Sequence, residues 1–494
     1  MSVRSAAGPG HANPVSIPLI GICVVLAGTV ALVAAQLGTL GLLAVGSFVG
    51  LAVALLVVRE RELLVTLVMI GSLQTVFHKS IGPIASDVSS GALSVYITSI
   101  DVLLLIAYGF WIASGEFSRD LATIWGKPVF MLPLVAIAST LPSTLVAPNL
   151  FLAAGELVRM IWMYGLFVYV ALRVRTRRDL SFVVGVLLLV AVAQFAVSAL
   201  QWRTGSSLGL AFLGEAETLG VRTLDGSEFA RPSGTVIHAD FLAALVAPIA
   251  LLSFAVAVEI RRRPWIRTVC IAVAAIGAGT LVLAQARAAM VGFGVGLVVL
   301  AVWYVLRGLI STRLVVAASG VLLLTALLFG GEVGGRLLGN FGTDQFQREV
   351  RSRIELNEIA LEMIGDHAVI GVGLNNFEQV MEGYDRYGLI FAGHPVHNLY
   401  LLVTAETGIV GAIGFALSAG AIGIAALRAA RLPSGLLSAT GAAVVATFIF
   451  FGTEELLTFS LRHDMPLAVF WLLAGLAVAC VRIDLHERAS PAPV

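Results

Sequence analysis

The chain has 494 residues, of which 59% are hydrophobic and only 12% are charged. This composition excludes an ordinary soluble protein, in which charged residues make up about a quarter of the chain. The net charge of +1 gives no reason to expect nucleic acid or a strongly charged partner. The three cysteines, Cys23, Cys270 and Cys480, lie in apolar runs without the spacing of a disulfide framework or a thiolate metal site. We therefore expect a multi-pass membrane protein.

Apolar runs long enough to span a membrane recur along the whole chain. A helix needs about 17 to 25 residues to cross a bilayer core about 30 Å thick, and it must be a helix because lipid satisfies no backbone hydrogen bond. The runs lie near residues 15–36, 39–58, 63–77, 95–113, 128–147, 150–172, 180–200, 236–257, 267–285, 289–306, 312–331, 398–427, 437–452 and 466–482. One run is short and Pro133 and Pro142 interrupt another, so the predicted fold class is an all-α polytopic membrane protein with roughly 12 to 14 transmembrane helices.

Basic residues occupy every second connection between these runs, a pattern that sets the orientation in the membrane. The basic connections carry Arg59 and Arg61; Arg119 and Lys127; Arg173, Arg175, Arg177 and Arg178; Arg261, Arg262, Arg263 and Arg267; Arg307 and Arg313; Arg428 and Arg431; and Arg482 and Arg488. This predicts that both termini are cytoplasmic. The connections at 78–94, 201–235, 332–397 and 453–465 and the turn at Arg287 are then external.

The expected organisation has five parts. They are a cytoplasmic tail (1–14), a transmembrane bundle (15–331), an extracytoplasmic loop subdomain (332–397), the C-terminal transmembrane helices (398–482) and a cytoplasmic tail (483–494). The first residues lack a signal peptide's compact basic start and cleavage site, so we expect the first apolar run to remain. Within the loop, the apolar period from Phe346 to Ile364 predicts a helix on the membrane surface or packed across the mouth of the bundle.

His397 is the strongest candidate for catalysis. An imidazole with an ordinary pKa of about 6.5 accepts a proton at neutral pH, as a base acting on a sugar hydroxyl must. The alternative is a structural histidine that caps its helix. His394 could support or replace His397, and Asn398 could orient the imidazole. The two histidines also fit a short zinc-like spacing, but no thiolate and no HExxH pair accompanies them.

Two arginines are candidates for binding phosphate. Arg287 stands between two apolar runs without a nearby acidic residue, which indicates either a ligand or a snorkelling interface anchor. Arg353, with Arg348 and Arg351 nearby, could present planar guanidinium groups to phosphate oxygens. Its alternative is a solvated helix face paired with glutamates. Arg159 follows Glu156 by three positions, the spacing of an intrahelical ion pair.

Several short motifs occur together in the second half of the chain. They are RPSGT at 231–235 ahead of His238; Arg287; Ser352 and Arg353; Gly371, Val372 and Gly373 with Phe377; and His397 and Asn398 followed by Glu406 and Gly408. Together they resemble the signature of the O-antigen ligase and Wzy polymerase superfamily, integral-membrane glycosyltransferases that act on lipid-diphosphate-linked glycans. The family often has Ser-Arg-Gly where this chain has Ala286, Arg287 and Ala288, and an aromatic residue is common where Leu356 and Asn357 stand.

The resemblance implies a GT-C-like fold and an inverting transfer that uses neither a metal nor another cofactor. The donor would be an undecaprenyl-diphosphate-linked glycan at the outer face of the bacterial inner membrane, and the other partners are a glycan or lipid-linked acceptor and the bilayer, with no nucleic acid. By the same resemblance, Arg287 and Arg353 would clamp the diphosphate, and His397 would orient or deprotonate the acceptor. The implied substrate-binding residues are Arg231, His394, Asn398 and His238.

Two questions stay open at the level of the sequence. The enzyme is either a polymerase that lengthens a polysaccharide or a ligase that moves a finished glycan to an acceptor. A multi-pass secondary transporter or lipid or polysaccharide exporter is the alternative class, and it would need ionisable residues at mid-membrane depth and an inverted repeat. Asp101 and the pair of Glu156 and Arg159 are the candidates for that role, and no repeat is visible.

Overall fold

The computed structural model describes residues 61–74, 78–81, 95–224, 227–313, 344–388 and 395–489. The runs expected at 15–36 and 39–58, and all but the first two residues of the run at 312–331, lie outside these ranges. The total number of transmembrane helices therefore stays a prediction. All contacts described below lie within residues 65–494, one of the two compact units of the chain.

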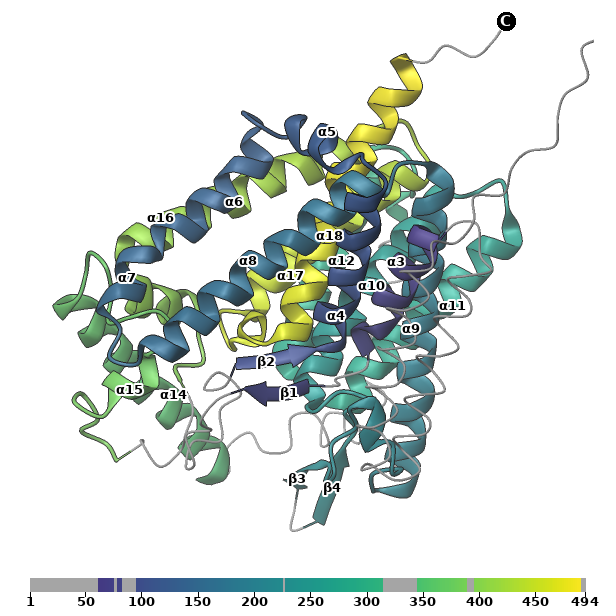
Figure 1. Ribbon diagram of the computed structural model, residues 1–494. Helices are drawn as coiled ribbons and strands as arrows, with labels where there is room; N and C mark the ends of the chain where they lie inside the picture. Colours follow the sequence, from purple (N-terminus) through teal and green to yellow (C-terminus); the bar gives the residue numbers. More distant parts are fainter. Residues whose placement is uncertain are drawn as a thin grey trace, which may run out of the picture. The chain divides into compact units, whose positions relative to one another are not determined.

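Helices dominate the described residues (Figure 1), and nine helical segments among them are long and apolar enough to cross a membrane. The predicted fold class of an all-α polytopic membrane protein is confirmed. The nine segments are α6 (Pro128–Ser139) with α7 (Leu141–Val146), α8 (Leu150–Arg173), α9 (Arg177–Thr204), α10 (Ala239–Glu259), α11 (Pro264–Ala284), α12 (Arg287–Leu306), α16 (Leu399–Ala430), α17 (Leu436–Glu454) and α18 (Asp464–Ala489).

The remaining elements are short, apart from one long polar helix. Helix α14 (Asp344–Asp366) confirms the helix predicted between Phe346 and Ile364, and its contacts with α16 show that it packs against the bundle. The others are α3 (Arg61–Gly71), α4 (Ser99–Ala113), α5 (Phe117–Ala122), α15 (Phe377–Met381), three single 3-10 turns (Ser72–Gln74, Ala211–Leu213 and Ser460–Arg462), and two antiparallel hairpins, β1 (His78–Ile81) with β2 (Val95–Thr98) and β3 (Gly220–Leu224) with β4 (Ser227–Arg231).

Two of the helices are shorter than the apolar runs that suggested them. The run at 95–113 begins as strand β2, and helix α4 starts only after Thr98. Asp101 accepts hydrogen bonds from the Thr98 backbone N–H at 2.6 Å and from its hydroxyl at 2.9 Å. This cap at the end of the strand sets the start of the helix. The expectation of one helix over the whole run at 95–113 was therefore wrong at its first four residues. The run at 63–77 is α-helical to Gly71 and continues as a 3-10 turn to Gln74, and residues 75–77 lie outside the described residues.

Helix α10 lies at the centre of the described bundle. It contacts α9, α11, α12, α17 and α18, and most of its side chains are buried. Alanine recurs along the helix, and small side chains let neighbouring helices approach closely where lipid provides no hydrophobic drive between them. Helix α10 is therefore packed closely against several neighbouring helices along its length.

Helix α16 is broken at Gly408, whose backbone is not helical (φ 63°, ψ −171°). A break leaves carbonyl and N–H groups without helical partners. The segment after α14 supplies them: Val372 and Gly373 donate N–H groups to the Ala405 and Glu406 carbonyls at 2.9 and 3.1 Å. On the other side of the break, Ile409 donates its N–H to the Ala368 carbonyl at 2.9 Å. The Gly-Val-Gly motif thus docks on the break in α16.

Glycine is required on both sides of this junction. The backbone of Gly408 lies in a region that side chains with a Cβ rarely adopt, and a Cβ there would overlap the Val369 carbonyl. Gly371 also has a positive φ of 72°, and a Cβ on it would overlap the Glu406 carbonyl. The two glycines let the loop backbone and the broken helix approach closely enough to pair.

Replacing Gly408 with alanine is expected to destabilise the protein by about 2 to 5 kcal/mol, because backbone strain and steric overlap add. The measurement is the thermal unfolding midpoint of the purified chain in detergent. Gly420→Ala is the matched control, since Gly420 lies in the same helix and a Cβ there meets nothing within 4 Å. Equal midpoints for the two variants would contradict the role given to the break.

Candidate active site

The start of α16 is joined to the end of α17. The Leu399 N–H donates to the carbonyls of Glu455 at 2.9 Å and Thr458 at 3.1 Å. Asn398 caps α16, because its Oδ1 accepts the N–H groups of Tyr400 and Leu401 at 3.0 and 3.1 Å. Asn398, which the sequence predicts to bind substrate, therefore also has a structural role as the N-cap of α16. His397 immediately precedes the cap and is held at the α16–α17 junction.

Arg353 and His397 lie against the same loop, which connects α17 to α18. Arg353 Nη1 donates to the Leu457 carbonyl at 3.0 Å. The ring centroids of His397 and Phe459 are 5.2 Å apart, and the two ring planes are nearly perpendicular at 78°. Because Leu457 and Phe459 are two positions apart, the loop brings together two predicted site residues that are far apart in the sequence.

A row of aromatic rings leads from His397 to the start of α10. The centroids of Phe459 and His463 are 5.6 Å apart, those of His463 and Phe241 are 4.1 Å apart, and those of Phe241 and His238 are 5.5 Å apart. His238 caps α10, and its Nδ1 accepts the Asp240 N–H at 3.3 Å. The predicted residue His238 is thus connected to His397 through three intervening rings.

Arg231 connects the start of α10 to the turn between α11 and α12. Its Nη2 forms an ion pair with Asp240 Oδ1 at 2.7 Å, and its Nε donates to the Ala284 carbonyl at 3.2 Å. Ala284 ends α11, and Gln285 adopts a left-handed conformation (φ 53°) that turns the chain. Arg287 then begins α12, so the half-buried Arg287 lies at a helix N-terminus, where the helix dipole also favours an anion.

The structure therefore relates most of the predicted site residues through contacts at neighbouring helix ends. Arg353 and His397 share the α17–α18 loop, and the ring row and Arg231 extend the group to His238 and to the turn before Arg287. His394 lies outside the described residues. Within the described ranges, no group of three or more histidine, cysteine, aspartate or glutamate side chains is placed to hold a metal ion.

A buried ion network lies next to these residues and was missed from the sequence. Arg462 is only 7% exposed, and its Nη2 donates to Glu406 Oε1 and to Asn375 Oδ1, both at 2.9 Å. Its Nη1 lies 3.8 Å from Glu156 Oε1. Glu156 also pairs with Arg159 at 2.7 Å, as predicted. One feature of the sequence points to this network: Arg462 lies in the connection at 453–465, which is predicted to be external, and the positive-inside pattern makes arginine less common there.

The network extends to the first residue of α18. Arg159 Nη1 pairs with Asp464 Oδ1 at 3.3 Å, so the guanidinium joins Glu156 of its own helix to α18. Glu406 is the residue whose carbonyl also accepts Gly373 at the break in α16. The ion network therefore fixes α8, α16, α18 and the segment that carries Asn375 to one another.

Two neighbouring carboxyl groups lie under the same loop. The Ser460 hydroxyl contacts Glu455 Oε1 and Glu454 Oε2, and both glutamates are 1% exposed. Burial raises the pKa of Glu455. Burial also lowers the pKa of His463 to about 3, and the nearby charges of Arg159 and Arg462 act in the same direction. His463 is therefore neutral at physiological pH and contributes a ring but no positive charge.

Residues 271–416 match the model of the Wzy_C family, which is described as O-antigen ligase. This part of the chain is therefore similar to the O-antigen ligase family. The resemblance predicted from the motifs is confirmed, and the segment includes Arg287, Arg353 and His397. Arg231 and Arg462 lie outside the matched residues. No curated protein sequence matches the chain.

Loss of the Arg462 charge is expected to be strongly destabilising, by about 3 to 5 kcal/mol, because Glu406 would remain buried without its partner. Thermal unfolding of Arg462→Gln in detergent measures the effect. Arg386→Gln is the control, since the ion pair of Arg386 with Glu362 is exposed to solvent and contributes little to stability. Adding Glu406→Gln to Arg462→Gln should recover part of the loss. A wild-type midpoint for Arg462→Gln would disprove the role of the network.

His463 predicts a pH dependence of stability. In the unfolded chain its pKa is near 6.5, whereas the folded chain holds it at about 3, so only the unfolded state gains a proton as the pH falls between these values. Lowering the pH from about 6.5 to about 5 should therefore reduce the unfolding midpoint of the wild type more than that of His463→Gln. Parallel slopes for the two proteins would show that His463 is not held neutral.

Proposed function

We propose that the protein is a membrane glycosyltransferase that moves a glycan from a lipid diphosphate to an acceptor hydroxyl at the outer face of the bacterial inner membrane. The observation that carries this proposal is the shared loop: Arg353 contacts Leu457 and His397 contacts Phe459. A cation for the leaving group and a base for the nucleophile are the two functions that such a transfer needs. The match to the O-antigen ligase family supports the same reaction class.

In this proposal, Arg287 and Arg353 hold the diphosphate. Guanidinium groups bind phosphate oxygens in a bidentate manner, and the N-terminus of α12 adds the positive end of a helix dipole beside Arg287. As the bond between the anomeric carbon and the phosphate oxygen breaks, negative charge develops on the diphosphate. The arginines stabilise the transition state because they are placed before this charge develops. Arg231, held by Asp240 and the Ala284 carbonyl, would support the anion from the neighbouring side.

His397 is proposed to take the proton of the acceptor hydroxyl as the oxygen attacks the anomeric carbon from the face opposite the diphosphate. This geometry inverts the configuration at that carbon. The activated bond is already present in the donor, so no nucleotide, metal or other cofactor is required. His238, Asn398 and His394 are proposed to contact the sugars. The donor is proposed to carry an undecaprenyl lipid, and the enzyme acts as a polymerase or as a ligase.

The proposed orientation follows from the basic connections. Both termini are cytoplasmic, residues 332–397 form an extracytoplasmic subdomain between the bundle at 15–331 and the helices at 398–482, and the tails are 1–14 and 483–494. Helix α18 continues to Ala489, so it extends into the second of these tails. On this orientation, Arg287 and His397 are at the outer ends of α12 and α16, and Arg353 lies in the middle of α14 within the extracytoplasmic subdomain.

One observation bears on the transporter alternative. A buried network of charges is typical of proton or ion transport when it lies at mid-membrane depth. Here Asp464 is the first residue of α18, Glu156 lies within the first two turns of α8, and Arg462 precedes α18 in the loop. The network therefore lies near the ends of these helices, where it braces the loop beneath the proposed site. This position favours the glycosyltransferase.

Replacing His397 with alanine is expected to lower kcat/KM by about 10²- to 10⁴-fold while the protein stays folded. Arg287→Ala and Arg353→Ala should each cost about 10²- to 10³-fold, and lysine at either position should restore only part of the loss. The assay is transfer of glycan from a lipid-diphosphate donor by the purified chain in detergent micelles, which have no inside and outside and so exclude transport.

The controls are an exposed histidine and an exposed arginine of the same region. His367→Ala and Arg348→Ala should retain wild-type activity, because these side chains are exposed and stand apart from the contacts described above. If His397→Ala transfers glycan at the wild-type rate, His397 is not the base. If the wild type transfers no glycan in micelles but moves a lipid-linked glycan across vesicle membranes, the transporter is correct.

A further inference from the structure

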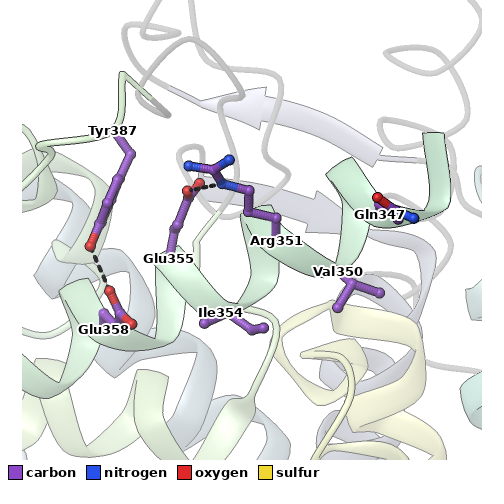
Figure 2. A pocket seen from close by; sticks show the side chains of 7 residues that line it. All are labelled: Gln347, Val350, Arg351, Ile354, Glu355, Glu358 and Tyr387. Carbon is purple, nitrogen blue, oxygen red and sulfur yellow. Dashed lines mark hydrogen bonds and ion pairs between the residues drawn. The ribbon is translucent and has the colours of Figure 1, made fainter. Parts of the chain in front are cut away.

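A groove of about 400 Å³ runs along α14, on the helix that also carries Arg353 (Figure 2). The lining residues on α14 recur at intervals of three and four positions, so they lie on one face of the helix. Tyr387, from the segment after α15, closes one end. The groove is lined by Gln347, Val350, Arg351, Ile354, Glu355, Glu358 and Tyr387.

The groove faces away from the bundle. Leu356, Ile359 and Met363 occupy the opposite face of α14, where they are buried with Leu402 of α16 and with Val396, the neighbour of His397. A helix is about 10 Å across, so the groove and the junction at His397 are separated by about one helix diameter. Because the inner face of α14 already covers the bundle, a ligand in the groove approaches from the side away from the membrane-spanning helices.

The lining combines apolar surface with hydrogen-bonding groups. Figure 2 shows Arg351 and Glu355 on one side of the helix axis and Val350 and Ile354 on the other. The Arg351 Nε donates to Glu355 Oε1 at 2.8 Å, and the guanidinium side chain remains 79% exposed. Val350 and Ile354 are 38% and 53% exposed. A sugar ring has the matching chemistry, with apolar C–H faces and a rim of hydroxyl groups.

Tyr387 adds an exposed aromatic ring at one end. Its hydroxyl donates to Glu358 Oε2 at 2.5 Å, and this hydrogen bond raises the pKa of the phenol, which stays neutral at physiological pH. The groove thus contains two carboxylates and one guanidinium. This balance disfavours a phosphate, and the charged groups disfavour a lipid chain, which would remove them from water without replacing their hydrogen bonds. An uncharged, hydroxyl-rich chain fits both constraints.

We propose that this groove binds the saccharide chain of a substrate glycan several sugars away from its reacting end. The proposal rests on the glycosyl transfer proposed above. Arg353 lies on the same helix as the groove, turned towards the α17–α18 loop, so a glycan whose reacting sugar is beside Arg353 reaches Ile354 by passing around α14. The groove would then give longer glycans extra affinity and would leave the chemical step unchanged.

The experiment measures glycan binding without turnover. Oligosaccharides are released by mild acid from the envelope glycan of the producing cell, separated by length, and titrated against the full-length chain in nanodiscs by saturation-transfer NMR. Tyr387→Ala and Ile354→Ser are expected to raise the Kd of the longer oligosaccharides by about tenfold and to leave that of a single sugar unchanged. Tyr387→Phe, which keeps the ring, should raise it less. Leu361→Ser is the matched control, since Leu361 is 57% exposed on the same helix but outside the groove.

The outcomes separate this proposal from the proposed reaction. If the wild type transfers glycan but the Tyr387 and Ile354 variants bind every oligosaccharide as the wild type does, the groove is not a glycan site and the reaction stands. If the oligosaccharides bind in a Tyr387-dependent manner and no transfer occurs, the groove stands and the reaction fails. Displacement of the oligosaccharide by inorganic phosphate or by a short-chain phospholipid at comparable concentration would overturn the assignment to a saccharide.

Discussion

The break in α16 at Gly408 is the constraint on which the proposed site depends. A helix that stops and restarts inside a membrane protein leaves backbone groups that lipid does not satisfy. Residues 368–373 pair with both sides of the break, so the segment after α14 is held by the backbone of α16 and not only by side chains. The position of α14, and with it Arg353, is consequently fixed relative to the short helical segment that begins beside His397.

The ion network stabilises the same junction through side chains. Glu406 takes part in both the backbone pairing at the break and the ion network. Its carbonyl accepts hydrogen bonds from the Gly373 N–H and the Ser143 hydroxyl, and its carboxylate forms an ion pair with Arg462. A buried ion pair adds little net stability compared with apolar packing, but it tolerates few alternative arrangements, because a misplaced partner leaves a buried charge unpaired. Its position between the break and the α17–α18 loop suits a network that holds the loop in one conformation.

The sequence predicted the fold class and the residues of the motifs, but not how the motifs meet. Gly371 and Gly408 were both visible as motif glycines, yet only the structure relates them, because backbone pairing between distant segments leaves no spacing in the sequence. The cap at Thr98 was missed because the apolar run continues across it. Arg462 was missed because its partners come from three distant segments. Arg353 and His397 were predicted individually, and their shared loop follows from the way α17 returns to the start of α16.

The two faces of α14 explain how one helix serves two purposes. Its buried face carries apolar side chains that pack on the start of α16, and Arg353 at the edge of this face contacts the α17–α18 loop. Its outer face carries polar side chains and two exposed aliphatic ones along a groove. Because the first face is fixed by the break in α16, the second face has a fixed orientation as well. A glycan held along α14 would therefore present its reacting end to Arg353 in a defined direction, which is what a transfer that inverts one carbon centre requires.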